Sequence, residues 1–275
     1  MARAFNDSAS EYLGCAAPLT ACPFAVAGWL RTDDVAANQT AWSLNLSSSN
    51  AHQICLLLRG ASAGDPLSFD MRAGGGFASA TTSNGLSLNT WHHGVGLAVA
   101  AADRRSILDG VIASKGTDST SLGMPTCDTM EFAALGDSSR SAYWSGQLAE
   151  FALWDLSDWP GATDSDKADE FERLAVPALA AGYSPLLFPL GLTGYWPLGG
   201  VYDADDGDHD VVGGYDMSPQ NTPTVADHVP GMIYPASVDD WVLTLVAGPP
   251  AAQIAAAIQP VFYLPRRPPL VAVPY

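Results

Sequence analysis

The chain has 275 residues, 12 of them basic and 29 acidic, and its formal net charge is −17. This charge excludes nucleic acid and anionic membranes as favourable partners, because both carry the same sign. With 48% hydrophobic and only 15% charged residues, the composition excludes a disordered chain and suits one large β domain or two ordinary domains. The first residues contain no apolar stretch with a cleavage site, so we expect a protein made without an export signal.

Short strands separated by turns are predicted from Phe24 to Trp154. The predicted strands are residues 24–31, 41–46, 53–59, 67–72, 77–82, 91–99, 105–113, 130–135 and 146–154. Residues 41–46 alternate in polarity, which places Trp42, Leu44 and Leu46 on one face. Asp109–Gly110 between apolar segments predicts a tight turn. Many short strands without long helices between them predict an antiparallel sandwich or jelly roll.

One helix is predicted at residues 167–174, with acidic residues in its first turn, an Asp or Ser N-cap and Pro177 near its end. A late strand over 194–200 and an acidic loop over 203–210 follow. After about Pro230 the composition changes, and residues 232–275 hold eight of the 20 prolines with charges that cancel. This composition predicts an appended arm.

Four segments in this order resemble the concanavalin A-like, laminin-G-like jelly rolls. They are residues 24–31, 89–95 leading into 107–111, 146–154 and 194–198. The resemblance covers about residues 5–230. It implies an all-β antiparallel β-sandwich jelly roll over residues 1–231, with one short helix, followed by an extended, Pro-rich apolar docking arm over 232–275. The closing portion, residues 213–235, is similar to uncharacterised laminin-G-like proteins of tailed bacteriophages, which implies a virion.

The acidic loop is the candidate metal site, because closely spaced carboxylates supply the hard oxygen ligands that Ca²⁺ prefers. The candidate calcium ligands are Asp203, Asp205, Asp206, Asp208 and Asp210. No Glu follows Gly207 at the distance an EF-hand needs, but the family resemblance implies calcium at the rim of the sandwich. The alternative is a solvated acidic turn that keeps the protein soluble.

Catalytic chemistry is not predicted. A glycan hydrolase needs two carboxylates about 5–10 Å apart, whereas Glu150 is followed at the next positions on its face by Ala152 and Trp154. We therefore expect Glu150 to be a structural acceptor near the sheet edge. His92 and His93 point to opposite faces of a strand and cannot share a metal, so packing is expected for Trp91 and one histidine. The four cysteines lack zinc-site spacing. Cys15 and Cys22 flank a Pro-containing turn and could form a disulfide in an oxidising compartment, but without an export signal free thiols are expected.

Two groups of residues are candidates for partner contacts. Tyr143, Trp144 and Trp159 lie in loop-like sequence and are expected to be exposed for a glycan or protein. The arm should dock on its own domain, a sister subunit or a capsid, because a segment this apolar should not stay free in water. The docking residues expected in the arm are Trp241, Phe262, Tyr263, Arg266, Arg267 and Tyr275.

Together, the resemblance and the arm predict a non-enzymatic bacteriophage virion protein, most concretely a capsid decoration or head-fibre protein on the capsid surface. Its partners would be the major capsid protein or another virion protein, further copies of itself (a trimer is one option) and a host-surface glycan. The alternative is a calcium-dependent glycan-binding module on a virion or a bacterial surface. A third reading is a glycan hydrolase.

Overall fold

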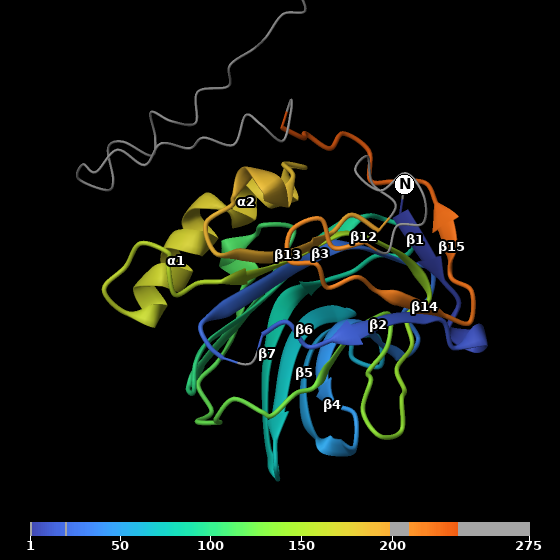
Figure 1. The fold of residues 1–275 in the computed structure, drawn as a ribbon, viewed down its shortest axis with the longest axis horizontal. Helices are drawn as coiled ribbons and strands as arrows, with labels where there is room; N and C mark the ends of the chain where they lie inside the picture. Colours follow the sequence, from blue (N-terminus) through green and yellow to red (C-terminus); the bar gives the residue numbers. More distant parts are fainter. Residues whose placement is uncertain (1, 20, 199–208, 236–275) are drawn as a thin grey trace, which may run out of the picture. The chain divides into compact units, whose positions relative to one another are not determined.

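The computed structural model describes residues 2–19, 21–198 and 209–235, and within them two antiparallel sheets form a sandwich (Figure 1). Sheet A runs in the order β10 (Gly116–Asp118), β9 (Asp103–Leu108), β8 (His92–Ala100), β3 (Phe24–Thr32), β12 (Gly146–Asp155), β1 (Ala2–Phe5) and β15 (Thr224–Ala226). In the same sheet, β13 (Leu192–Trp196) also pairs with β12. The predicted all-β sandwich is therefore confirmed.

Sheet B runs in the order β14 (Ser218–Gln220), β2 (Tyr12–Ala16), β11 (Thr129–Phe132), β4 (Asn38–Leu46), β5 (Ser49–Arg59), β6 (Pro66–Ala73) and β7 (Gly76–Gly85). Strands that are distant in sequence are neighbours in both sheets, such as β11 beside β2 and β12 beside β3. These crossovers are typical of a jelly roll.

The core lies between the sheets and follows the period-two pattern of the strands. Trp42 and Leu44 are fully buried as predicted, whereas Leu46 at the end of β4 is only half-buried. In β3, a Cβ at Gly28 would lie 2.5 Å from Cδ2 of Phe151 on the neighbouring strand. Glycine at this position therefore makes room for an aromatic ring of the core.

Two helices lie against sheet A, on the face away from the core (Figure 1). Helix α1 (Asp164–Leu174) begins at the N-cap Thr163, and not at the Asp or Ser that we expected. Thr163 and Asp166 form a capping box, in which each side chain accepts the backbone N–H of the other residue. A second, unpredicted helix, α2 (Val176–Ala180), follows directly, with Pro177 in its first turn.

The predicted turn at Asp109–Gly110 is present, and both residues have positive φ, 54° and 69°. The residues after it do not continue the strand as predicted. They form a short 3₁₀ helix, η2 (Ile112–Ser114), beside which Val111 and Ile112 remain exposed. The strand that returns to β9 is the later β10.

The first compact unit of the chain is Met1–Asp240. Its contacts extend past residue 231, because Ile233 pairs with Tyr183 and donates its N–H to the carbonyl of Gly182 at 2.7 Å. The expected docking residues of the arm lie outside the described residues. Among the described residues, no helix is long and apolar enough to cross a membrane. All four cysteines are free thiols, as expected.

Candidate functional site

A shallow pocket of about 280 Å³ lies on the outer face of sheet B, across β14, β2 and β11. We call it the sheet B groove, and it is lined by Tyr12, Gly14, Cys15, Thr129, Glu131, Arg140, Ser218 and Gln220. The alternation of the strands explains most of this lining: Leu13, Met130 and Phe132 point into the core, so Tyr12, Gly14, Thr129 and Glu131 point outward, whereas Cys15 packs against the core at the edge of the lining. The groove therefore combines one aromatic ring with several hydrogen-bonding side chains.

An ion pair organises the groove. The Nε and Nη2 atoms of Arg140 both donate to the carboxylate of Glu131, at 2.7–3.1 Å. The side chain of Glu131 is only 3% exposed, against 35% for Arg140, and a Cβ at Gly136 would overlap this carboxylate. The guanidinium also lies over the ring of Tyr12, 4.3 Å from its centroid. The hydrogen bonds to Glu131 raise the pKa of Arg140, so the arginine stays charged.

Arg140 still has hydrogen-bonding capacity. Its Nε and Nη2 donate to Glu131, whereas its Nη1 donates to none of the residues that the structure describes. Ser218 and Gln220 on β14 are exposed at the opposite side of the groove. A polyhydroxylated ligand would thus find donors and acceptors already held in place.

Glu150 lies elsewhere, in sheet A, and is 2% exposed. It accepts hydrogen bonds from the hydroxyl of Tyr195, from Nε2 of His228 at 2.8 Å and from the hydroxyl of Tyr234 at 2.8 Å. The structural acceptor was predicted correctly, but its position near the sheet edge was wrong. Strand β12 is an interior strand, with β3 on one side and β1 and then β13 on the other.

The structure brings together a serine, a histidine and an aspartate at the start of β8, Ser87, His92 and Asp109, which the sequence analysis did not predict. Nδ1 of His92 lies 2.8 Å from Oδ2 of Asp109, and the hydroxyl of Ser87 lies 3.0 Å from Nε2 of His92. The backbone N–H of Ser87 also donates to Nε2, at 3.0 Å. The lone pair of Nε2 is therefore already in use, and the three residues close the loop between β7 and β8.

Burial raises the pKa of Asp109, but hydrogen bonds from His92 and from the backbone of His93 outweigh it and lower the pKa overall. His93 points the other way, as expected, and packs edge-on against Trp29 with 5.3 Å between the ring centroids. Burial lowers the pKa of His93 to about 4. Trp91 is partly buried in the same apolar cluster.

Two of the three predicted contact residues are not exposed. Trp144 is fully buried in the core, and its backbone N–H donates to the carbonyl of Ala133, which draws the loop inward. Trp159 is 5% exposed, packs on Phe171 and donates Nε1–H to the carbonyl of Leu190. The expectation that these tryptophans meet a partner is therefore wrong. Tyr143 is half-buried, and its role stays a prediction.

Of the candidate calcium ligands, only Asp210 lies within the described residues; Asp203, Asp205, Asp206 and Asp208 lie outside them. Asp210 is 7% exposed, and its carboxylate accepts hydrogen bonds from the backbone N–H groups of Tyr195, Val212 and Tyr215. Both of its oxygens are thus used to shape the loop. Within residues 2–19, 21–198 and 209–235, no group of three or more His, Cys, Asp or Glu side chains is placed to hold a metal.

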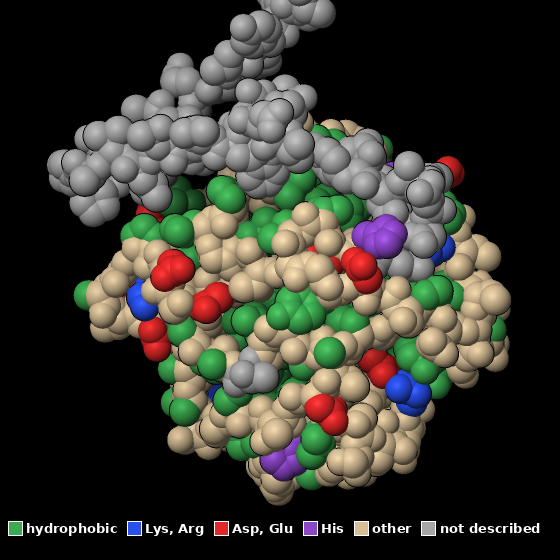
Figure 2. All heavy atoms as spheres, viewed as in Figure 1, with side chains coloured by type: hydrophobic (Ala, Val, Ile, Leu, Met, Phe, Trp, Pro, Cys, Tyr) green, Lys and Arg blue, Asp and Glu red, His purple; other side chains and the backbone are tan. Residues whose placement is uncertain are grey.

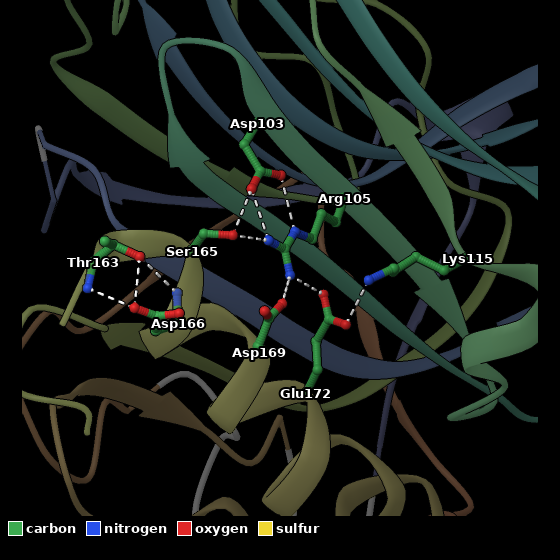
Figure 3. Close-up of polar contacts among 8 residues, drawn as sticks. All are labelled: Asp103, Arg105, Lys115, Thr163, Ser165, Asp166, Asp169 and Glu172. Carbon is green, nitrogen blue, oxygen red and sulfur yellow. Dashed lines mark hydrogen bonds and ion pairs between the residues drawn. The ribbon is translucent and has the colours of Figure 1, made fainter. Parts of the chain in front are cut away.

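A polar cluster holds α1 against sheet A (Figure 3). The guanidinium of Arg105 donates to both carboxylate oxygens of Asp103, to Asp169 and Glu172 on α1, and to the hydroxyl of Ser165. Glu172 also pairs with Lys115 at 2.7 Å. These hydrogen bonds, led by the one to Asp103, raise the pKa of Arg105. Every donor is occupied by the protein itself, so the cluster is structural.

Comparison with known proteins agrees with the fold. A family model described as the Concanavalin A-like lectin/glucanases superfamily matches residues 7–157, more than half of the chain. The chain belongs to this superfamily. Comparison with curated proteins gave no match.

Solved structures with a similar fold include a candidate carbohydrate-binding protein from Bacteroides ovatus, at a TM-score of 0.53 and 15% identity, which covers 81% of this chain. This chain in turn spans 58% of that protein. Another is the CBM40 module of the IT-sialidase from Ruminococcus gnavus bound to α2,3-sialyllactose, at a TM-score of 0.43 and 12% identity, covering 58% of this chain and 92% of that one. At these identities the likeness shows the fold alone.

Proposed function

We propose that this protein is a non-enzymatic, glycan-binding jelly roll displayed on a bacteriophage virion. The observation that supports glycan binding is the sheet B groove, where the ring of Tyr12 lies beside the fixed Glu131–Arg140 pair and the exposed Gln220. An aromatic ring with preorganised polar groups is the usual composition of a small-ligand site. Membership of a superfamily that is named for lectins and glucanases supports the same class of ligand.

Binding fits the groove better than hydrolysis does. Hydrolysis of a glycan needs two carboxylates about 5–10 Å apart across a cleft, and Glu131 is the one carboxylate among the lining residues. Glu131 is neutralised by Arg140, and Glu150 belongs to the other sheet. The Ser87–His92–Asp109 group offers no free base, since Nε2 of His92 already accepts a backbone N–H.

The virion assignment rests on the sequence: the similarity of residues 213–235 to phage proteins and the apolar arm over 232–275. In this proposal the arm attaches the protein to the major capsid protein or another virion protein, copies of the chain cluster there, and the jelly roll faces outward. Mass spectrometry and electron microscopy of purified particles test it. A chain absent from the particles would refute this part of the proposal and leave glycan binding standing.

Glycan binding is tested on the full chain with a glycan array followed by calorimetry. We expect Tyr12→Ala and Gln220→Ala to weaken binding at least fivefold, because they remove groups that line the groove. Arg173→Gln is the control, since this exposed arginine on α1 pairs only with Glu170. Wild-type protein that binds no glycan, or groove variants that bind as tightly as wild type, would refute the site.

Calcium is the proposed cofactor of the acidic loop, through Asp203, Asp205, Asp206 and Asp208. The array and a thermal melt are therefore repeated with and without a chelator. Calcium binding predicts a lower melting temperature in the chelator. Identical melting and identical glycan binding would contradict the cofactor without affecting the groove.

A further inference from the structure

The charges of the sheet B groove determine which glycans it can take. Among the described residues, Glu131 and Arg140 are the only charged ones that line it, and they form an ion pair at 2.7 Å. The remaining lining side chains are uncharged. Cys15 packs against the core, and burial, followed by the charges of Asp210 and Asp216, raises the pKa of its thiol to about 12, so it adds no charge. The groove itself is therefore neutral.

The surroundings of the groove are negative. Asp216 is near enough to act electrostatically on Cys15, a residue at the edge of the lining. The side chain of Asp216 is 58% exposed and precedes β14 by two residues. The whole chain carries −17 charges, and few Lys or Arg side chains are visible on the face drawn in Figure 2. A ligand carboxylate that approaches this groove meets repulsion from its neighbours.

The cation in the groove, Arg140, is already paired with Glu131. Sites for carboxylates commonly present an arginine as a two-pronged donor. In Arg140 the Nε–Nη2 edge is already occupied by the carboxylate of Glu131, which also balances its charge. The N–H groups of Nη1 and the second N–H of Nη2 can still donate to sugar hydroxyls, which bring no charge, whereas a ligand carboxylate would have to share Arg140 with Glu131.

We infer that the sheet B groove selects uncharged glycans and disfavours the same glycans once they carry a sialic or uronic acid. This inference rests on the proposed glycan binding and adds the class of sugar. Glu131 is then a specificity residue: it positions Arg140 over Tyr12 and removes the positive charge that an acidic sugar would need.

The test compares ligands that differ by one carboxylate. Glycans found on the array are measured by calorimetry in neutral and acidic pairs, with lactose and α2,3-sialyllactose as the first pair. We expect the neutral member of each pair to bind about tenfold more tightly in 20 mM salt, and the ratio to shrink in 0.5 M salt because screening removes the repulsion. Equal or tighter binding of the acidic member, or a ratio that salt does not change, would overturn the inference.

Glu131→Gln probes the residue directly, with Glu170→Gln on α1 as the matched control. Freed from its partner, Arg140 should attract the acidic member and reduce the ratio at least threefold, while the control keeps the wild-type ratio. An unchanged ratio in folded Glu131→Gln would overturn the role of this residue. Should this buried variant fail to fold, the salt series on wild-type protein decides the question. Loss of binding to every glycan, neutral and acidic, would refute the proposed function instead.

Discussion

A single glutamate marks the point where strand β12 changes partners. Glu150 has a φ of 55°, in the left-handed region that is uncommon for side chains other than glycine. Before it, β12 pairs with β1 at Gly146–Leu148, and after it with β13 at Phe151–Trp154. The register of β12 with β3 shifts here, which marks a β-bulge. The bulge turns the carboxylate toward Tyr195, His228 and Tyr234, whose hydrogen bonds offset the cost of this backbone conformation.

Glu150→Ala should destabilise the domain by about 3 kcal/mol, because it leaves buried donors without an acceptor. Burial and the charge of Glu150 together raise the pKa of Tyr195, so this tyrosine stays a neutral donor. Urea unfolding measures the loss, with Glu170→Ala on α1, which removes only the ion pair with the exposed Arg173, as a control that should change stability by no more than about 0.5 kcal/mol. A loss as small as that of the control would show that the hydrogen bonds of Glu150 contribute little.

Protonation of a buried histidine should destabilise the domain in acid. The pKa of His93 is about 4 in the folded protein, against about 6.5 in an unfolded chain. Between these values the unfolded state binds a proton that the folded state does not. The free energy of unfolding is therefore unaffected by His93 above pH ~6.5. As the pH falls from there toward 4, protonation of His93 in the unfolded state lowers this free energy by about 3 kcal/mol.

The measurement is the free energy of unfolding of wild-type protein and His93→Gln between pH 4 and pH 8. The wild-type curve should fall more steeply toward acid than the curve of the variant. Parallel curves would mean that His93 is already protonated in the folded state, or that other groups cause the acid sensitivity.

At the scale of elements, α1 is held to sheet A by the Arg105 cluster. The side chain of Arg105 is 6% exposed, and that of Glu172 is 7% exposed. Arg105→Gln leaves the carboxylates of Asp103, Asp169 and Glu172 close together without their main cation. We expect a loss of about 3–5 kcal/mol and faster amide exchange over residues 164–174.

Arg173→Gln is the matched control on the same helix. Its ion pair with Glu170 is solvent-exposed on the arginine side, 56%, and such pairs contribute about 0.5 kcal/mol. Equal effects of the two substitutions on the exchange of α1 would contradict the special role of Arg105.

The sequence pattern identifies the central elements better than the edges. Strands such as β3, β5 and β12 have long runs of alternating or apolar residues, and their existence was predicted within a few residues of their bounds. Strands β1, β2, β14 and β15 were missed, because they have three to five residues each and form only by pairing with a neighbour. Two of these missed strands, β2 and β14, supply five of the eight residues that line the groove, so its geometry could not be predicted from local pattern.

Sequence pattern also misplaced the exposed aromatic residues. Polar neighbours suggested that Trp144 and Trp159 are free on the surface, but each indole is buried by packing that the local sequence does not encode. Tyr12, the aromatic residue of the groove, stands in a short stretch with no strong pattern. Glu131 and Arg140 are nine residues apart on a strand and a loop, and their pairing depends on how that loop folds back.

For the whole molecule, the two sheets have different outer faces. The outer face of sheet A is covered by α1, α2 and the described segment up to Pro235, whereas the outer face of sheet B carries the groove. The end of the described segment therefore lies on the sheet opposite to the candidate ligand site. This arrangement suits a domain that is attached from one side and binds from the other.

Two truncations test this division. A chain ending at Asp240 keeps the whole first unit and should melt like the full chain while it fails to attach to particles. A chain ending at Gly231 also loses the Ile233–Gly182 hydrogen bond and the Tyr234–Glu150 contact, and should be less stable by about 1–3 kcal/mol. Unfolding of the longer truncation would mean that residues after Asp240 belong to the core.

The pairing of the first strands with the last ones has a consequence for synthesis. Strand β2 pairs with β14, and β1 pairs with β15. These two early strands therefore lack one of their neighbours in the sheets until residues 218–226 have been synthesised. Because β14 forms one wall of the groove, a nascent chain cannot complete the proposed binding site until the ribosome has passed that strand. The site therefore forms only when the late strands join the two sheets and the jelly roll closes.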